Sequence, residues 1–247
     1  MNKSFLKQTF LYGLLSDYRA WKAGNALRLI NVYPLELAEI IKDYRYSITK
    51  DYRTVMQVLN IESCIKHVKD NNIDGAFVET GTWTGGASAY ALLSMKRNNI
   101  CLTYWGFDSF EGMPDPTSDD DSQSISWAGD DPRKLNNADR EACYTYLSET
   151  GYEVSKINLI KGWFDESLVM HKSKVGPIAI LRLDGDFYES TKVPLLELYP
   201  QVVNGGIVII DDYGTFEGCK KAIDEIVLGQ DILYAENGVR YFVKKSN

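Results

Sequence analysis

The sequence predicts an α/β fold in which a doubly wound, mostly parallel sheet follows an N-terminal helical extension. From Ala76 onward, short apolar runs rich in β-branched residues alternate with helical stretches. Uninterrupted apolar runs are typical of strands buried on both faces of a parallel sheet, and the alternation predicts crossover helices. The beginning of the chain reads as helical, with a break at 31–34. We therefore expect an extension over residues 1–60 and the main domain over residues 61–247.

Five apolar runs are the expected strands, and a helix is expected over residues 85–96. The runs are Ala76 to Val78, Leu102 to Phe107, Ile157 to Ile160, Ile178 to Leu183 and Gly206 to Ile210. Ligands of such sheets bind beyond the carboxyl ends of the strands. The residues that follow the strands are therefore the first candidates for a site, and many are acidic: Glu79, Asp108, Asp165, Asp184, Asp211 and Asp212.

The first candidate motif is the glycine turn after the first strand. It reads Glu79-Thr80-Gly81-Thr82-Trp83-Thr84-Gly85-Gly86. The spacing differs from the G-x-G-x-x-G pattern that cradles a pyrophosphate. An acidic residue before the turn suits a cationic ligand better than a phosphate, and S-adenosylmethionine carries an ammonium and a sulfonium group. The alternative is a plain junction between a strand and a helix.

Two further groups of carboxylates follow strands. Asp108 ends the second strand, where a carboxylate can accept hydrogen bonds from both hydroxyls of a ribose; a capping or loop role is the alternative. Leu183-Asp184-Gly185-Asp186 and Ile210-Asp211-Asp212-Tyr213 follow neighbouring strands. Such carboxylates repel each other unless a cation or a proton lies between them, and oxygen ligands select Mg²⁺, Mn²⁺ or Ca²⁺. Helix capping would explain Asp186 or Asp212 singly.

Composition excludes several classes of protein. The formal net charge of −7 and the isoelectric point near 5.0 argue against a nucleic-acid partner, because phosphate contacts need clustered Lys and Arg. The four cysteines form no C-x-x-C pair and indicate reduced thiols in a cytoplasmic protein. His67 and His171 lie outside the motifs, which argues against zinc.

Two segments allow two interpretations each. The apolar residues from Phe5 to Trp21 recur at helical spacing, and we favour a helix packed on its own domain or another subunit over one that lies on a membrane. No membrane contact is therefore expected. The segment 114–132 is rich in aspartate and reads either as a solvated loop or as a mobile lid over the site.

The motifs together resemble the macrocin O-methyltransferase (TylF-like) family of sugar methyltransferases, from Thr54 to Phe242. The strings that carry the resemblance are Val78-Glu79-Thr80-Gly81, Gly106-Phe107-Asp108-Ser109-Phe110-Glu111-Gly112, Lys161-Gly162-Trp163-Phe164, Leu181-Arg182-Leu183-Asp184-Gly185-Asp186-Phe187-Tyr188-Glu189-Ser190-Thr191, Leu198-Tyr199-Pro200 and Asp211-Asp212-Tyr213. The segment before Tyr44 does not match.

The resemblance implies a Rossmann-like class I methyltransferase fold that uses S-adenosylmethionine and Mg²⁺ or Mn²⁺. It implies cofactor contacts from Glu79, Thr80, Gly81, Asp108, Ser109 and Asp165. It also implies Asp184, Asp211 and Asp212 as metal ligands, with Asp184 as the general base. The acceptor would be a hydroxyl of a sugar or a glycosylated natural product, and the enzyme would be a homo-oligomer.

Other functions remain open from the residues alone. A catechol-type methyltransferase shares the metal and the cofactor and differs in its acceptor. A nicotinamide-dependent oxidoreductase suits the winding but lacks its glycine motif. A non-catalytic binding module would be expected to lack the metal carboxylates, which are present here.

Overall fold

The computed structural model describes residues 52–234 and 240–245. The described chain begins with helix α6 (Tyr52–Asp70), so the expected extension lies almost wholly outside the described residues. Within the described ranges, no helix is long and apolar enough to cross a membrane.

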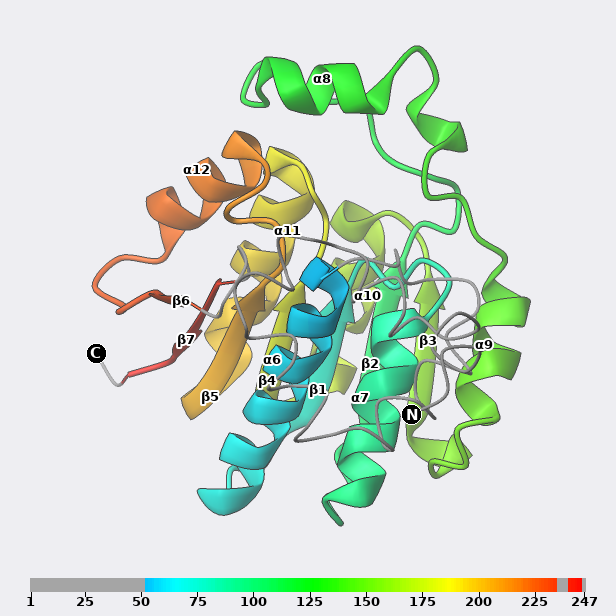
Figure 1. Cartoon of the computed structure of the whole chain (residues 1–247), viewed down its shortest axis with the longest axis vertical. Helices are drawn as coiled ribbons and strands as arrows, with labels where there is room; N and C mark the ends of the chain where they lie inside the picture. Colours follow the sequence, from blue (N-terminus) through cyan, green and yellow to red (C-terminus); the bar gives the residue numbers. More distant parts are fainter. Residues whose placement is uncertain (1–51, 235–239, 246–247) are drawn as a thin grey trace, which may run out of the picture.

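The described residues form one seven-stranded sheet in the order β3-β2-β1-β4-β5-β7-β6 (Figure 1). The strands are β1 (Ala76–Thr80), β2 (Tyr104–Asp108), β3 (Ile157–Lys161), β4 (Ile178–Leu183), β5 (Val202–Ile210), β6 (Leu233–Tyr234) and β7 (Arg240–Val243). The first five strands pair in parallel, whereas β7 pairs antiparallel with both β5 and β6. All five predicted strands are confirmed, and β6 and β7 were not predicted.

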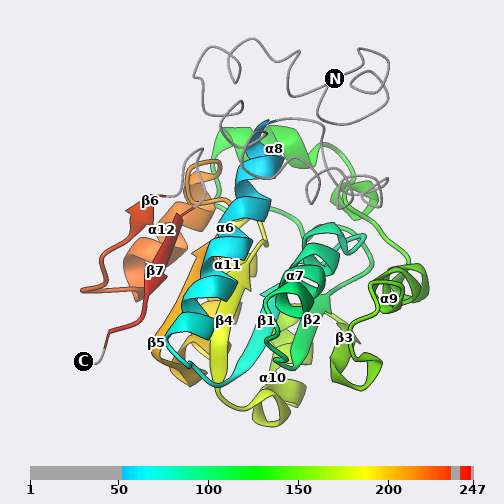
Figure 2. The ribbon, with the colours of Figure 1, turned by 60° about the horizontal axis from the view of Figure 1, so that its bottom comes forward.

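Helices cover both faces of the sheet, as a doubly wound fold requires (Figures 1 and 2). They are α7 (Gly86–Arg97), α8 (Ser122–Ala128), α9 (Arg140–Ser148), α10 (Phe164–Val175), α11 (Tyr188–Leu198) and α12 (Glu217–Ile226). One core cluster joins α6, α7 and α9 to residues such as Phe77 and Ile180. The other joins α10, α11 and α12 to the alternate strand residues, such as Val78 and Leu181. Successive strand side chains point to opposite faces, so both faces are apolar.

The strand order reverses between β1 and β4. After β1 the chain moves outward to β2 and β3, then returns to β4 on the other side of β1. In an open α/β sheet this reversal separates the loops beyond the strand ends and opens a crevice for ligands. The carboxyl ends of β1, β2 and β4 are therefore where the fold favours a site.

Helix α6 is fixed to the domain by a buried polar network. Glu62 accepts hydrogen bonds from Ser94 Oγ (2.5 Å), Tyr90 OH (3.0 Å) and Arg97 Nη2 (2.7 Å) on α7. Burial alone would raise the pKa of Glu62, but these donors, with Asn98, outweigh it and lower the pKa to about 2. The network holds the carboxylate charged and keeps α6 in register with α7.

Candidate active site

The turn after β1 lies directly against the end of β4. Gly81 has a φ of +89°, and a Cβ atom there would lie 1.8 Å from the carbonyl oxygen of Asp184. The amide of Asp184 donates a hydrogen bond to the Thr80 carbonyl over 2.9 Å. A side chain at position 81 would push the two strand ends apart, which explains the glycine in the predicted turn.

Asp108 organises the loops after β1 and β2. Its carboxylate accepts hydrogen bonds from the Trp83 amide (2.8 Å) and the Phe110 amide (2.7 Å). Burial raises the pKa of Asp108, although these backbone donors oppose the rise. The neighbouring Ser109 hydroxyl donates to the Gly112 carbonyl over 2.7 Å and tightens the same loop.

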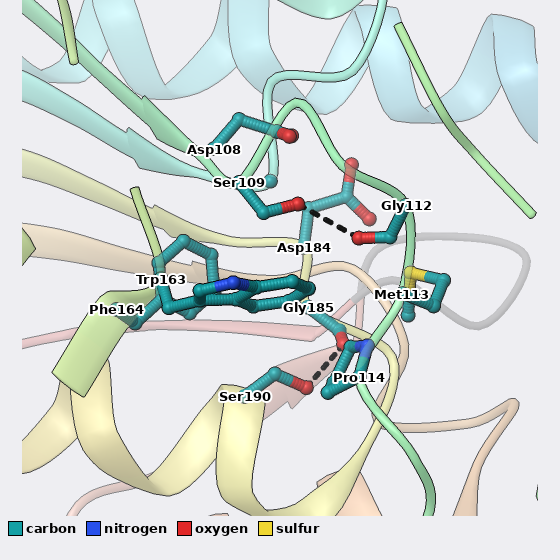
Figure 3. Close-up of a pocket in the computed structure, with 11 residues that line it drawn as sticks. Asp108, Ser109, Gly112, Met113, Pro114, Trp163, Phe164, Asp184, Gly185 and Ser190 are labelled. Carbon is teal, nitrogen blue, oxygen red and sulfur yellow. Dashed lines mark hydrogen bonds between the residues drawn. The ribbon is translucent and has the colours of Figure 1, made fainter. Parts of the chain in front are cut away.

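These loops line a pocket at the reversal of the strand order. Its wall includes Gly81, Asp108, Ser109, Met113, Trp163 and Asp184 (Figure 3). In Figure 3 Asp108, Ser109 and Asp184 lie on one side of the Trp163 ring, and Ser190 lies on the other. The pocket therefore combines a flat aromatic surface with carboxylates and backbone groups. Such a surface suits a heteroaromatic ring joined to a polar chain.

A group of carboxylates begins where the pocket meets β4. Oxygen atoms of Asp184, Asp186 and Asp212 all lie within 4.8 Å of one another. Burial raises the pKa of all three, and their mutual repulsion adds to the effect for Asp186 and Asp212. Oδ2 of Asp212 is buried without a hydrogen-bond partner among the described residues. An orphaned buried oxygen beside other carboxylates fits a hard divalent cation.

Asp211 lies beside this group but has protein partners at both oxygens. Oδ1 accepts a hydrogen bond from Arg182 Nη2 over 2.7 Å, and Oδ2 accepts one from Gln57 Nε2. Burial raises the pKa of Asp211 to about 6, against the opposing effect of Arg182. Each carboxylate oxygen has two lone pairs, so these bonds leave Asp211 able to take a further ligand.

Glu79 is enclosed beneath the pocket and is 1% exposed. Its Oε1 accepts from Arg182 Nη1 (2.6 Å), and its Oε2 accepts from Tyr104 OH (2.5 Å) and from Ser88 Oγ. Both carboxylate oxygens of Glu79 therefore accept hydrogen bonds from protein donors. One of these donors is Arg182, so Glu79 helps to fix the position of the guanidinium group.

The aspartate-rich segment 114–132 is a folded excursion that contains α8. Asp121 caps the helix by accepting from the Ser124 amide (2.7 Å), and Asp120 is buried, where it accepts from the Tyr188 amide (2.8 Å). The expectation of a solvated loop is wrong for these residues, because capping and burial use the carboxylates internally. At its base the Met113 amide donates to the Pro132 carbonyl over 3.0 Å.

Aromatic contacts hold this excursion over the acidic group. Trp127 on α8 packs against Phe187 and Phe216 at centroid distances of 6.0 and 5.3 Å. Phe187 follows Asp186 directly, and the Phe216 amide donates to the Asp212 carbonyl over 3.0 Å. Trp127 remains 39% exposed, so these contacts leave part of the residue open to solvent.

Comparison with known proteins identifies the family. The model of the macrocin-O-methyltransferase (TylF) family matches residues 46–234. The chain belongs to this family. It is 35% identical over 180 residues to a demethyldecarbamoylnovobiocin O-methyltransferase of Streptomyces niveus, and the match covers 69% of this chain and 65% of the relative.

A second relative and a solved structure extend the likeness to the TylF family. The 8-demethyl-8-(2,3-dimethoxy-alpha-L-rhamnosyl)-tetracenomycin-C 4'-O-methyltransferase of Streptomyces olivaceus is 30% identical over 167 residues, which cover 67% of this chain and 63% of the relative. The chain thus spans somewhat less than two thirds of these two relatives. The structure of the O-methyltransferase NovP is similar with a TM-score of 0.69 and 29% identity, over 78% of this chain and 81% of NovP. This likeness confirms the predicted Rossmann-like class I fold.

The predicted site residues of this TylF-family chain fall into four groups. Gly81, Asp108, Ser109 and Asp184 line the pocket. Thr80, Glu79 and Asp211 are buried around it, and Asp212 belongs to the carboxylate group. Asp165 is exposed in the first turn of α10, directly after the pocket residue Phe164.

The sequence analysis assigned no role to Gln57, Met113, Arg182 or Ser190. Arg182 had a visible signal, because it is a charged residue inside the apolar run of β4. Gln57 had none, since nothing in a helical pattern shows that its side chain reaches the end of β5.

Proposed function

We propose that this protein is a metal-dependent O-methyltransferase that moves a methyl group from S-adenosylmethionine to a hydroxyl of a sugar or glycosylated natural product. The observation that carries the proposal is that Asp184 belongs both to the pocket and to the group of carboxylates. It lines the pocket with Asp108 and Trp163, and it also belongs to the carboxylate group with Asp186 and Asp212. A methyl donor in the pocket and a hydroxyl at the carboxylates would meet at this residue.

The pocket supports the cofactor assignment. The Asp108 carboxylate can accept hydrogen bonds from ribose hydroxyls, and the Trp163 ring offers a face to the adenine. Gly81 lets the backbone approach the methionine portion closely. We also propose that Thr80, Ser109 and Asp165 contact S-adenosylmethionine. Because Glu79 is 1% exposed, we expect it to act on the cofactor through the electric field of its charge.

The carboxylates support the metal assignment. Asp184, Asp211 and Asp212 would hold Mg²⁺ or Mn²⁺, with Asp186 close enough to contribute through an oxygen or a water. When bound, such an ion would supply Lewis-acid chemistry that lowers the pKa of an acceptor hydroxyl. Asp184 would take the proton from that hydroxyl, and the pocket would hold the donor methyl in line with the hydroxyl oxygen.

The family and its relatives support the acceptor class. One relative acts, by its name, on a rhamnosyl-tetracenomycin, and the other, by its name, acts on demethyldecarbamoylnovobiocin. We therefore propose a small sugar-like acceptor. We also propose a cytoplasmic location and a homo-oligomeric assembly, the former in keeping with four free cysteines.

Calorimetric titration tests the proposal. S-adenosylmethionine and then S-adenosylhomocysteine are titrated into the purified protein with and without Mg²⁺. Both should bind, and Mg²⁺ should be required for turnover on rhamnosylated acceptors. If a well-folded protein binds neither compound, the methyltransferase assignment is wrong and a binding module becomes the better description.

A further inference from the structure

Arg182 is a buried cation at the centre of the sheet, and it is 2% exposed. Its guanidinium contacts carboxylates at the ends of three neighbouring strands. Nη1 donates to Glu79 (2.6 Å) and to Asp184 (2.8 Å), and Nη2 donates to Asp211 (2.7 Å). The arginine therefore joins the end of β1, its own strand β4 and the end of β5.

Burying the charge of Arg182 inside the sheet costs desolvation free energy, and a purely structural role does not explain why the protein accepts that cost. Arg182 interrupts a strand whose other residues are apolar and buried, and its Nε has no hydrogen-bond partner among the described residues. Removing a charge from water is unfavourable unless the partners are well placed, and apolar residues of similar size often stabilise a core better. The carboxylates that the arginine orients give this arrangement a role beyond stability.

The arginine is itself held by Glu79, which does not line the pocket. Glu79 lies opposite Arg182 in the parallel register of β1 and β4. Tyr104 of β2 and Ser88 of α7 donate to the other oxygen of Glu79 and fix its carboxylate. A fixed carboxylate fixes the plane of the guanidinium, because the fork geometry of arginine is rigid.

We infer that Arg182 is a positioning residue for the metal site: anchored by Glu79, it holds one oxygen each of Asp184 and Asp211, so that their other lone pairs point to the cation. The inference rests on the proposed function. It adds a residue that touches neither cofactor nor acceptor but sets the geometry of two proposed ligands. Such supporting residues, when changed, typically lower metal affinity by about 10- to 100-fold.

Substitutions that keep the charge test this role. Arg182→Lys retains the cation but loses the fork, and Glu79→Asp retains the anion but withdraws it by one methylene. Mn²⁺ affinity is measured from the electron paramagnetic resonance signal of the free ion, and the spectrum of the bound ion reports ligand geometry. Arg182→Lys should weaken Mn²⁺ binding about tenfold or more and alter the bound spectrum. Glu79→Asp should also weaken Mn²⁺ binding, by a smaller factor. This second variant tests the inference if Arg182→Lys folds poorly.

Arg97→Lys is the control, because Arg97 forms an ion pair with Glu62 over 2.7 Å and neither residue lines the pocket. It should lower thermal stability without changing Mn²⁺ binding. If Arg182→Lys and Glu79→Asp bind Mn²⁺ as the wild type does, the positioning role is wrong while the proposed function stands. If both variants lose Mn²⁺, S-adenosylmethionine and thermal stability together, the arginine is structural and the inference is also overturned. If the wild type itself binds neither Mn²⁺ nor S-adenosylmethionine, the proposed function fails instead.

Discussion

Gln57 donates a hydrogen bond to Asp211, although 154 positions separate them in the chain. The contact joins α6, at the start of the described chain, to the carboxyl end of β5. It gives Asp211 a neutral donor at Oδ2 to match the charged donor, Arg182, at Oδ1. The first described helix therefore takes part in shaping the acidic end of the site.

Gln57→Ala should weaken Mg²⁺-dependent activity more than it weakens the fold. Loss of one hydrogen bond to a charged group costs about 1.5–3 kcal/mol when the group stays buried. We expect a higher Mg²⁺ requirement for turnover, measured by titrating the metal in the methyl-transfer assay. Lys69→Ala, at an exposed position of the same helix, should leave that requirement unchanged. An unchanged Mg²⁺ requirement in Gln57→Ala would show that the contact has no catalytic consequence.

Asp184→Asn should remove turnover while leaving the cofactor in place. The amide cannot accept the proton, and general-base groups contribute about 100-fold or more to rate. Calorimetry should find S-adenosylmethionine binding nearly unchanged, since Asp108 and Trp163 remain. Asp130→Asn, at an exposed position, controls for loss of a surface carboxylate. Retained activity would exclude Asp184 as the base.

Asp108→Asn should weaken cofactor binding. Both carboxylate oxygens accept from backbone amides, so the amide nitrogen of asparagine would face an N–H donor. We expect the Kd for S-adenosylmethionine to rise at least about tenfold, equivalent to about 1.4 kcal/mol. Calorimetry measures the Kd, and Mn²⁺ affinity serves as the internal control because it should change little. An unaltered Kd would contradict the ribose assignment.

Stabilisation by Mg²⁺ should grow with pH. The raised pKa values of Asp184, Asp186, Asp211 and Asp212 mean that the folded, metal-free protein holds protons which the unfolded chain releases. The free energy of unfolding should therefore fall as pH rises above 3.8, the ordinary pKa of an aspartate, and through about 6, to which burial raises the pKa of Asp211. Mg²⁺ replaces these protons, so its effect on Tm should be larger at high pH.

Thermal unfolding at about pH 5.5 and 8 checks this sign, with NaCl of equal ionic strength as the control. A Mg²⁺-induced rise in Tm that is equal at both values, or larger at the lower one, would argue against displacement of protons from these carboxylates.

Trp127→Ala should raise the KM for the acceptor. The ring packs on Phe187 and Phe216, which flank Asp186 and Asp212, and part of it remains exposed. Truncating an aromatic residue that contacts a ligand often costs about 2 kcal/mol or more, so KM should rise at least about tenfold. The Kd for S-adenosylmethionine should stay constant. Ile125→Ala, an exposed apolar position on the same helix, provides the comparison and should leave KM unchanged.

The parallel part of the sheet was predictable because its strands are buried on both faces. Runs such as Ile178–Leu183 have no other favourable environment in an α/β protein. The antiparallel β7 (Arg240–Val243) is short and carries an arginine, so its sequence does not distinguish it from a loop. Its pairing with β5 depends on tertiary structure.

The site was predictable where residues follow strands and unpredictable where distant segments meet. The position of Asp108 and Asp184 at the pocket could be predicted because the carboxyl ends of parallel strands share one edge. Helix α8 was missed because Asp, Ser and Gly favour loops locally, whereas Trp127 stabilises it through contacts remote in sequence. The partners of Asp211 depend on the path of α6, which no local pattern specifies.

The hydrogen bond from the Met113 amide to the Pro132 carbonyl brings together the two ends of the α8 excursion. An insert whose ends already meet can change its length or sequence without moving the strands to which it is attached. Evolution could therefore exchange this insert between enzymes as a unit, altering the surface around Trp127 while Asp108, Trp163 and Asp184 keep their places in the pocket. Chimaeras joined at these two positions would inherit the sheet of one parent and the insert of the other.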